Sequence, residues 1–277
     1  MDATTARKRD ALAALLRSFG SVCIGYSGGV DSVFLAKAAV DALGASRVLA
    51  ATGRSAAYPL VQRDVAIECA RTFGIPHVEV DTAELDDPRY AANPSNRCYY
   101  CKTELWSRLR ALADERGLAF VLDGSNADDA GDFRPGMSAA RENHVRSPLL
   151  EVGLAKAEIR ALSRSEGLPT WDQPSAPCLS SRLPYGLAVT VDRLAQVERA
   201  EAGVRALGFR EFRVRHHGDA ARLEFGDAEL HAAERAAAEL CEVVEAAGFP
   251  RVLLDVDGYR SGALNEALPL VPLRAGP

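Results

Sequence analysis

The sequence lacks any apolar stretch that approaches the roughly 18 residues needed for a membrane-spanning helix. It also lacks the small-residue cleavage site of a secretory signal, and charged residues are spread through residues 1–20. This segment instead places its large apolar residues on one stripe, as an amphipathic helix does: Leu12, Leu15, Leu16 and Phe19. We therefore expect a cytoplasmic protein with no membrane partner.

An excess of basic residues is absent as well. The formal net charge is -5, which argues against a broad nucleic-acid-binding surface and leaves room only for a local basic patch. Internal repeats and low-complexity tracts are also missing. A chain of 277 residues is long enough for one large domain or two unequal ones. We expect no nucleic-acid partner.

What is present is an alternation of short apolar runs and amphipathic segments. The apolar runs predict strands at residues 22–24, 47–52, 77–81 and 119–123. The segments between and after them predict helices at residues 33–43, 58–73, 98–116 and 154–167. Strands that alternate with helices form right-handed βαβ units. The sequence therefore predicts an α/β fold, with a parallel twisted sheet and helices on both faces.

The pattern changes near residue 184. Residues 168–184 contain four prolines and show no periodicity, so we expect this segment to be irregular. Beyond it the sequence predicts helices at residues 191–207 and 227–247 and strands at 209–216, 221–225 and 251–256. We therefore expect two domains, residues 1–184 and a smaller α+β domain of residues 185–277. The residues after Gly258 receive no assignment.

A glycine-rich turn joins the first strand to its helix, with the sequence SGGVDS at residues 27–32. Adjacent Gly28 and Gly29 let the backbone turn tightly and bring N–H groups close to a ligand. The N-terminus of the following helix adds positive potential, so the turn suits a pyrophosphate. It is not a Walker loop, because no Gly-Lys-Ser/Thr is present. The alternative is an ordinary strand–helix turn that binds nothing.

A second polar loop, GSNADD at residues 124–129, follows the fourth strand. In open parallel sheets, ligands bind at the carboxyl ends of the strands, where both loops lie. Asn126, Asp128 and Asp129 are therefore candidates for a nucleotide site, in which the carboxylates would hold Mg²⁺. They could equally be turn formers and helix caps.

Six cysteines in a reducing compartment are not expected to form a disulfide framework. We interpret those with apolar neighbours as small core residues: Cys23, Cys69 and Cys241. Cys98 and Cys101 form a Cys-x-x-Cys, and Cys178 lies in the proline-rich segment. Zinc would require a fourth ligand, and no histidine has a matching spacing. Three thiolates could hold an iron–sulfur cluster with one open iron, or the three could never meet in space.

Five motifs together resemble the LarE family of ATP-dependent sulfur transferases, members of the PP-loop ATP pyrophosphatase superfamily that mature the nickel-pincer nucleotide cofactor of lactate racemase. The motifs are SGGVDS at 27–32, NRCYYCK at 96–102, GSNADD at 124–129, PCLSSR at 177–182 and RVRHHGDAARLE at 213–224. The resemblance implies that ATP adenylates a carboxylate of a pyridinium dicarboxylate mononucleotide and releases pyrophosphate. Sulfur then displaces AMP and leaves a thiocarboxylate.

The resemblance implies two possible sulfur sources. In one type, a lone cysteine matching Cys178 attacks the acyl adenylate, gives up its sulfur and becomes dehydroalanine. In the other type, three cysteines bind a 4Fe–4S cluster that carries an extra sulfide. This sequence has all three, Cys98, Cys101 and Cys178, so we expect the cluster type, with a sacrificial Cys178 as the alternative. Ser181 and Arg182 share the neighbourhood of Cys178, where an arginine could bind phosphate or lower a thiol pKa.

The resemblance also implies roles in ATP binding. The backbone amides of residues 28–31 and the hydroxyls of Ser27 and Ser32 would hold the phosphates. Asp31 would help to hold Mg²⁺. Lys102 would stabilise charge on the leaving AMP, and its alternative is a solvated helix lysine.

A basic cluster is expected in the C-terminal half. Arg213 and Arg215 are two apart on a predicted strand, so both side chains point to one face, about 7 Å apart. That spacing suits a phosphate clamp, which Arg222 and Glu224 on the next strand could complete. We expect this cluster to bind the substrate's phosphate at the interface of a homo-oligomer, which the family suggests. The alternative is a solvated, salt-bridged strand face.

Three other functions are alternatives. An amide ligase similar to NAD or GMP synthetase needs ammonia delivery, and no glutaminase segment is present. A tRNA thiolase would be expected to carry a more basic surface or an added RNA-binding module. A nucleotide-binding regulator that kept the fold would bind ATP without releasing pyrophosphate.

Overall fold

The computed structural model describes residues 2–131, 135–259 and 270–272. The chain divides into two compact units. Unit 1 contains Met1–Glu84 and Asn96–Ala176, and unit 2 contains Leu85–Ser95 and Pro177–Pro277. In this division residues 177–184 and Leu85–Ser95 belong with the C-terminal unit, whereas the sequence-based division at residue 184 assigns both segments to the first domain.

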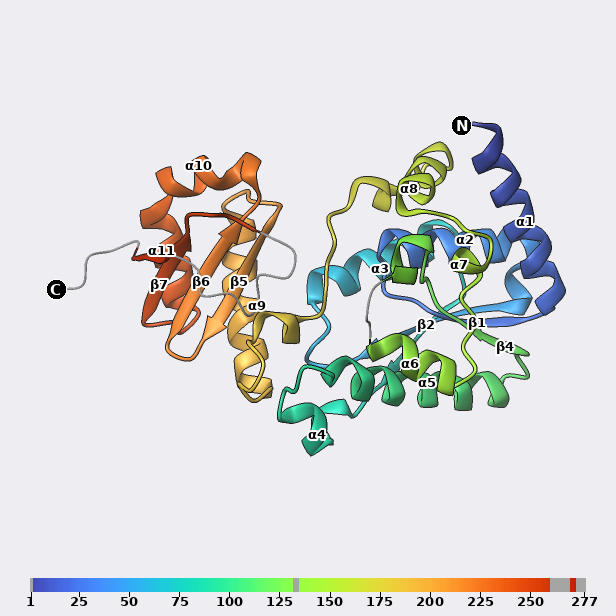
Figure 1. The fold of residues 1–277 in the computed structure, drawn as a ribbon, viewed down its shortest axis with the longest axis horizontal. Coiled ribbons are helices and arrows are strands. Elements are labelled where there is room, and N and C mark those ends of the chain that lie inside the picture. The colour runs from blue at the N-terminus through green and yellow to red at the C-terminus, as the bar shows by residue number, and fades with distance from the viewer. Residues whose placement is uncertain (1, 132–134, 260–269, 273–277) are drawn as a thin grey trace. The chain divides into compact units, whose positions relative to one another are not determined.

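Unit 1 is built on a four-stranded sheet in the order β3-β2-β1-β4, and all of its strands are parallel (Figure 1). The strands are β1 (Val22–Gly25), β2 (Val48–Arg54), β3 (His77–Asp81) and β4 (Phe120–Leu122). Val22 pairs with Val48 on one side and with Phe120 on the other, so β1 is a central strand. The predicted parallel sheet is confirmed.

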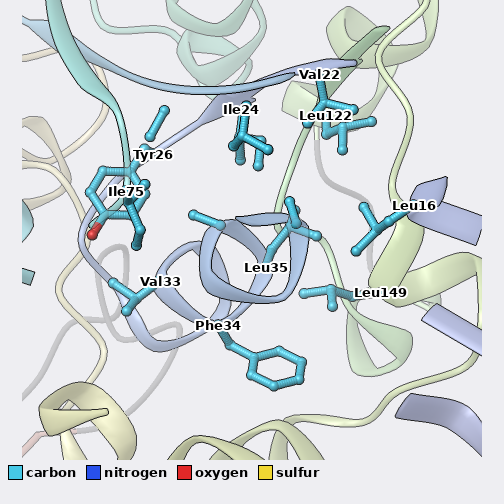
Figure 2. Close-up of a cluster of buried hydrophobic side chains, with 14 of the residues drawn as sticks. Leu16, Val22, Ile24, Tyr26, Val33, Phe34, Leu35, Ile75, Leu122 and Leu149 are labelled. Carbon is cyan, nitrogen blue, oxygen red and sulfur yellow. The ribbon is translucent and has the colours of Figure 1, made fainter. Parts of the chain in front are cut away.

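Helices cover both faces of this sheet, as Figure 1 shows with α5 and α6 on one side and α2 and α8 on the other. Val22 and Ile24 of β1 join a buried cluster with α1 and α2, whereas Cys23 joins a second cluster with α5 and α6. Figure 2 shows the first cluster, in which Leu35 of α2 lies beneath the strands. Because successive strand residues point to opposite faces, both faces must be apolar, which explains the unbroken apolar run that the sequence shows.

The helices of unit 1 are α1 (Ala3–Phe19), α2 (Val30–Leu43), α3 (Leu60–Thr72), α5 (Arg97–Glu115), α6 (Pro135–Glu142), α7 (Pro148–Glu151) and α8 (Lys156–Ser165). Short 3₁₀ turns lie at η1 (Ala45–Arg47), η2 (Glu84–Asp86), η3 (Ala127–Gly131) and η4 (Pro169–Asp172). The N-terminal helix begins where the Asp2 side chain accepts hydrogen bonds from the Thr4 and Thr5 N–H groups. No described helix is long and apolar enough to span a membrane.

Unit 2 contains a mixed sheet in the order β5-β6-β7-β8. Its elements are α4 (Pro88–Ala91), η5 (Leu179–Arg182), α9 (Val191–Ala206), β5 (Phe212–His217), β6 (Ala220–Phe225), α10 (Asp227–Arg235), α11 (Ala237–Ala246), β7 (Arg251–Asp255) and β8 (Leu270–Pro272). The pair β5–β6 is antiparallel, β6–β7 is parallel and β7–β8 is antiparallel. The predicted small α+β region is confirmed.

The prediction of one helix over residues 227–247 is wrong. The helix is interrupted at Ala236, which has φ -92° and ψ 20°. The alanine-rich sequence favours a continuous helix, but α10 packs against β6 whereas α11 packs against β7 and α9. Tertiary packing on different partners therefore overrides the local helix propensity.

Candidate active site

The glycine loop connects the carboxyl end of β1 to the N-terminus of α2. Gly28 has φ +67°, a left-handed conformation that favours glycine. A Cβ at this position would lie 2.7 Å from the Cβ of Ala66 in α3, so the loop passes directly against that helix. Gly29 is the N-cap of α2 and carries no side chain to accept from the first-turn N–H groups. These donors are left for an anion.

Two serine hydroxyls lie together in this loop. Ser27 Oγ and Ser32 Oγ are 3.2 Å apart, and Ser32 Oγ donates to the Gly29 carbonyl at 3.1 Å. Two side chains that are not part of the loop also anchor it: Tyr58 Oη and Gln62 Nε2 each donate to the Ser27 carbonyl at 3.0 Å. The sequence reading missed Tyr58 and Gln62. Tyr58 follows β2 at the carboxyl edge of the sheet, where ligands bind in open parallel sheets, so its place in the sequence could have identified it as a site residue.

The second polar loop lies in contact with the glycine loop. A Cβ on Gly124 would lie 3.3 Å from Asp31 Cβ and 3.3 Å from the Ser32 nitrogen. Asn126 Nδ2 donates to Asp31 Oδ1 at 3.4 Å. Lys156 Nζ forms an ion pair with Asp31 Oδ2 at 2.5 Å. The Asp31 carboxylate is therefore held between an amide and an ammonium group, and the sequence contains no local signal for Lys156.

The two acidic residues of the second loop have structural partners. Asp128 Oδ2 accepts from the Lys156 N–H at 2.8 Å, at the start of α8. The Asp128 N–H donates to Asn126 Oδ1 at 3.0 Å, and Asp129 Oδ2 accepts from the Asn126 N–H at 3.0 Å. These bonds are typical of turn formers and helix caps. The geometry thus favours the structural alternative for Asp128 and Asp129.

Lys102 lies on α5, one helical turn before Trp106. Its Nζ is 5.1 Å from the centroid of the Trp106 ring. That ring packs against Gly25, where a Cβ would lie 2.6 Å from Trp106 Cζ3. Among the described residues, Lys102 forms no hydrogen bond or ion pair with the glycine loop. It is therefore near the loop through Trp106 and is not one of the groups that shape it.

The cysteines fall into two sets by exposure, and none of the six forms a disulfide. The prediction of three core cysteines is confirmed, because Cys23, Cys69 and Cys241 are at most 2% exposed. Burial raises the pKa of the Cys23 thiol to about 12. In contrast, the three motif cysteines are exposed or half-buried: Cys98, Cys101 and Cys178.

The predicted three-cysteine metal site is not gathered within either unit. Cys98 and Cys101 are three residues apart on α5, hence on one side of that helix, and both belong to unit 1. Cys178 belongs to unit 2 and immediately precedes η5. Among the described residues of each unit, no group of three His, Cys, Asp or Glu side chains could hold a metal ion. The cluster therefore stays a prediction.

Arg182 holds the backbone that carries Cys178. The residue is 3% exposed, and its guanidinium forms a bidentate pair with Glu201, at 2.8 and 3.0 Å. Its Nη1 donates to the carbonyls of Pro177 and Cys178, at 2.7 and 3.2 Å, and to Ser181 Oγ at 3.0 Å. These contacts assign Arg182 a positioning role for the Cys178 loop.

The sequence reading also missed Glu201, although a signal was present. Glu201 occupies the buried stripe of α9, whose other members are apolar: Leu194, Val197, Ala200 and Val204. A carboxylate on an apolar stripe requires a buried partner, and here that partner is Arg182.

The arginines of β5 lie on one face of the sheet, as their spacing predicts. Arg213 and Arg215 are 7% and 6% exposed, so the face is not solvated as the alternative expects, although it is salt-bridged. Arg215 donates to Glu224 Oε2 at 2.9 Å and to the Ser181 carbonyl at 2.7 Å. Arg222 donates to Glu224 Oε1 at 2.5 Å. Glu224 therefore joins Arg215 and Arg222 into one buried, hydrogen-bonded group.

Positive charge is in excess in this region. Each of the following is at most 7% exposed: Arg182, Arg213, Arg215, Arg222, Glu201, Glu224 and Asp255. Among the residues that the structure describes, four buried arginines of this region thus lie with three buried carboxylates. Burial raises the pKa of Asp255. Burial also lowers the pKa of Arg213, with a contribution from the neighbouring Arg182. A buried region with this imbalance suits an anionic ligand.

A parallel sheet with a glycine loop after β1, a polar loop beside it and no Walker lysine is the arrangement of a PP-loop nucleotide-binding α/β protein. Comparison of the sequence with known protein families supports this class. Residues 9–114 match the NAD synthase family.

The chain is 37% identical over 267 residues to the pyridinium-3,5-bisthiocarboxylic acid mononucleotide synthase of Lactiplantibacillus plantarum, with 96% of both chains covered. It is 44% identical over 247 residues to an uncharacterised Synechocystis sp. protein, covering 88% of this chain and 92% of the relative. The chain therefore belongs to the family of this synthase, the LarE family, and is an ATP-dependent sulfur-transferring enzyme.

The tRNA thiolase alternative has weaker support. A tRNA-specific 2-thiouridylase of Xanthobacter autotrophicus is 29% identical over 221 residues, which cover 66% of this chain and 56% of that enzyme. The similarity to the mononucleotide synthase extends over almost the whole of both chains. We therefore base the functional assignment on the synthase.

Proposed function

We propose that the enzyme uses ATP to convert a carboxylate of a pyridinium dicarboxylate mononucleotide into a thiocarboxylate, a step in making a nickel-pincer nucleotide. The observation that carries this proposal is the 37% identity over 96% of both chains to a synthase named for that thiocarboxylate product. The glycine loop and the buried arginines of unit 2 provide the two kinds of anion site that such a reaction needs.

The first half of the reaction is adenylation. A substrate carboxylate oxygen attacks the α-phosphorus of ATP, and pyrophosphate leaves. Ser27, Ser32 and the first-turn amides of α2 would hold the phosphates, because these donors lie together at the loop. Asp31 and Asn126 are in contact beside them and would bind Mg²⁺. Lys102 would stabilise the leaving AMP.

The substrate's own phosphate is assigned to the charged face of β5 and β6. Arg213 and Arg215 would contact it, and Ser181, Arg182 and Glu224 would position them, because hydrogen bonds link Arg182 to Ser181 and Arg215 to both Ser181 and Glu224. Changing Arg213 to alanine should raise the substrate KM more than it lowers kcat, because the interaction is the same in ground and transition states. Arg251→Ala, which removes an exposed ion pair with Asp219, is the matched control. An unchanged KM for the Arg213 variant would contradict this assignment.

The sulfur source is proposed to be a 4Fe–4S cluster held by Cys98, Cys101 and Cys178. The donor set fits, because these three thiols are exposed or half-buried whereas the other three cysteines are buried in cores. Such a cluster, when bound, would supply a sulfide on its open iron. The alternative is Cys178 itself, which would attack the acyl adenylate, release AMP and lose its sulfur by Cβ–S cleavage.

The iron and acid-labile sulfide content of protein purified without oxygen tests the cluster. We expect about four irons and four sulfides per chain, lost in Cys98→Ala and retained in Cys69→Ala, which alters a buried core cysteine. Absence of iron after reconstitution would instead support the sacrificial Cys178. In that case the intact mass after one turnover should show the loss of one sulfur.

The proposed division of labour gives ATP chemistry to residues 1–184 and substrate binding with self-association to residues 185–277. A homo-oligomer is proposed because the family suggests self-association, and light scattering after size exclusion tests it. Because the reaction consumes ATP, we propose a cytoplasmic location. We also propose that no nucleic acid takes part, and copurification of tRNA would contradict this.

A further inference from the structure

A short segment from the first half of the chain packs onto the loop that carries Cys178. Residues 85–95 belong to unit 2 together with residues 177–277. Tyr90 is 1% exposed and Asn93 is fully buried. Both are therefore buried as deeply as core residues, although the segment forms only the single helical turn of α4.

Tyr90 anchors the 3₁₀ turn that follows Cys178. Its Oη lies 2.6 Å from Ser180 Oγ, although the two residues are 90 positions apart, and both side chains are buried. Cys178 is the N-cap of this turn, η5, so the anchored hydroxyl belongs to the second residue after the thiol. A single 3₁₀ turn has poor hydrogen-bond geometry. The contact with Tyr90 therefore fixes a turn that has little rigidity of its own.

Asn93 anchors the chain beyond the turn. Its Nδ2 donates to the carbonyls of Pro184 and Leu187, both at 2.8 Å. Its own carbonyl accepts from the Gly186 N–H at 2.9 Å. Asn93 has φ +55°, a left-handed conformation that asparagine adopts more readily than most residues with a Cβ. The residue type thus suits both the backbone conformation and the hydrogen bonds.

Packing alone would not require these polar groups. Phenylalanine at position 90 would fill nearly the same volume, and replacing both partners of a buried hydrogen bond by apolar groups of the same shape can be nearly neutral for stability. A hydrogen bond, in contrast, fixes the distance and direction between two atoms. The polar contacts therefore specify where the loop lies more than how stable the unit is.

We propose that Tyr90 and Asn93 are positioning residues that hold the Cys178 sulfur in place for sulfur transfer. The inference rests on the proposed use of Cys178, and it applies whether that residue attacks the acyl adenylate or ligates a cluster. Arg182 holds the backbone on the N-terminal side of η5, and residues 85–95 hold the turn and the chain after it. A misplacement of about 1 Å can slow a reaction about 10²-fold, so anchors on both sides of the loop have a functional reason.

The two half-reactions distinguish positioning of Cys178 from a general loss of folding. In a single turnover of protein purified without oxygen, at saturating ATP and substrate, pyrophosphate reports adenylation and thiocarboxylate reports sulfur transfer. In Tyr90→Phe we expect pyrophosphate to form at the wild-type rate and thiocarboxylate to form about 10- to 100-fold more slowly. Ser180→Ala should behave alike, and the double variant should be no slower than either single variant, because both changes remove the same contact.

Asn93→Gly keeps the left-handed backbone accessible and removes the amide, so it should show the same separation of the two rates. The matched control is Asn143→Gly, which removes an amide that donates to the Ala139 carbonyl at 2.8 Å in unit 1. It should leave both rates unchanged.

Two results would overturn the inference. Tyr90→Phe and Asn93→Gly could form thiocarboxylate at the wild-type rate, or they could lose pyrophosphate and thiocarboxylate formation equally. In either case these residues do not position Cys178. If the wild type itself forms no pyrophosphate from ATP and the substrate, the proposed function fails and the inference fails with it.

Discussion

Substituting Gly28 with alanine should damage both the fold of unit 1 and the ATP site proposed at the glycine loop. Two costs can be separated from the structure. Gly28 has φ +67°, and a left-handed backbone costs a residue with a Cβ about 1–2 kcal/mol. The new Cβ would also lie 2.7 Å from Ala66 Cβ and 2.9 Å from the Ala66 backbone of α3. Relieving such overpacking typically costs about 1–3 kcal/mol.

We therefore expect Gly28→Ala to lower the free energy of unfolding by about 2–5 kcal/mol. Gly20→Ala is the matched control, since Gly20 has φ +75° but a Cβ there would enter open space, with no atom within 4 Å beyond its chain neighbours. It should lose only the backbone cost of about 1–2 kcal/mol. Gly29→Ala should avoid the clash, because its Cβ would meet only Ser27 Oγ at 3.5 Å, and should lose only the smaller cost of alanine at an N-cap, but it should weaken ATP binding by crowding the phosphates.

Urea unfolding followed by tryptophan fluorescence measures these differences. Both tryptophans, Trp106 and Trp171, belong to unit 1, so the signal reports that unit. ATP titration of the folded variants gives the binding effect. If Gly28→Ala is no less stable than Gly20→Ala, then α3 moves away from the new Cβ without lowering the free energy of unfolding. The close approach of loop and helix would then not be what holds the loop in place.

Three further changes test other parts of the fold. Burial lowers the pKa of His77 below its usual 6.5, so on acidification the unfolded chain is protonated at His77 before the folded chain is. The folded state should therefore lose stability as the pH falls below 6.5. His77→Gln should reduce this loss, as measured by urea unfolding at several pH values. Arg182→Met leaves Glu201 buried without its ion-pair partner, which should cost about 3–5 kcal/mol in unfolding followed by circular dichroism, whereas Arg182→Met with Glu201→Leu should recover much of that cost. Gly203→Ala would place a Cβ 2.9 Å from Val243 Cβ and should cost about 1–3 kcal/mol, which Val243→Ala in the same chain should not relieve, because alanine keeps that Cβ.

Local sequence identified the elements that carry the glycine loop. An apolar run, two glycines and a helical pattern were enough to predict strand, turn and helix around residues 22–43, because each depends on neighbours in the chain. The apolar neighbours of Cys23, Cys69 and Cys241 likewise predicted burial, which the structure confirms. The continuous helix over residues 227–247 failed, because packing on separate strands interrupts it at Ala236.

The site was only partly readable from the sequence. The two strand-end loops were predicted to share one edge, since parallel strands end together. The partners of Asp31 were not, because Lys156 lies 125 residues away and its short-range pattern is that of any helix start. Glu201 could have been found, because it interrupts an apolar stripe of α9.

By itself, the sequence determined the parallel α/β sheet, the glycine turn after its first strand and the family of the enzyme, because periodicity and motifs are local properties of the chain. Only the tertiary structure decided which charges pair: Asp31 with Lys156, and Arg182 with Glu201. Those pairings follow from where the whole fold places distant side chains, and burial then makes a matched partner obligatory.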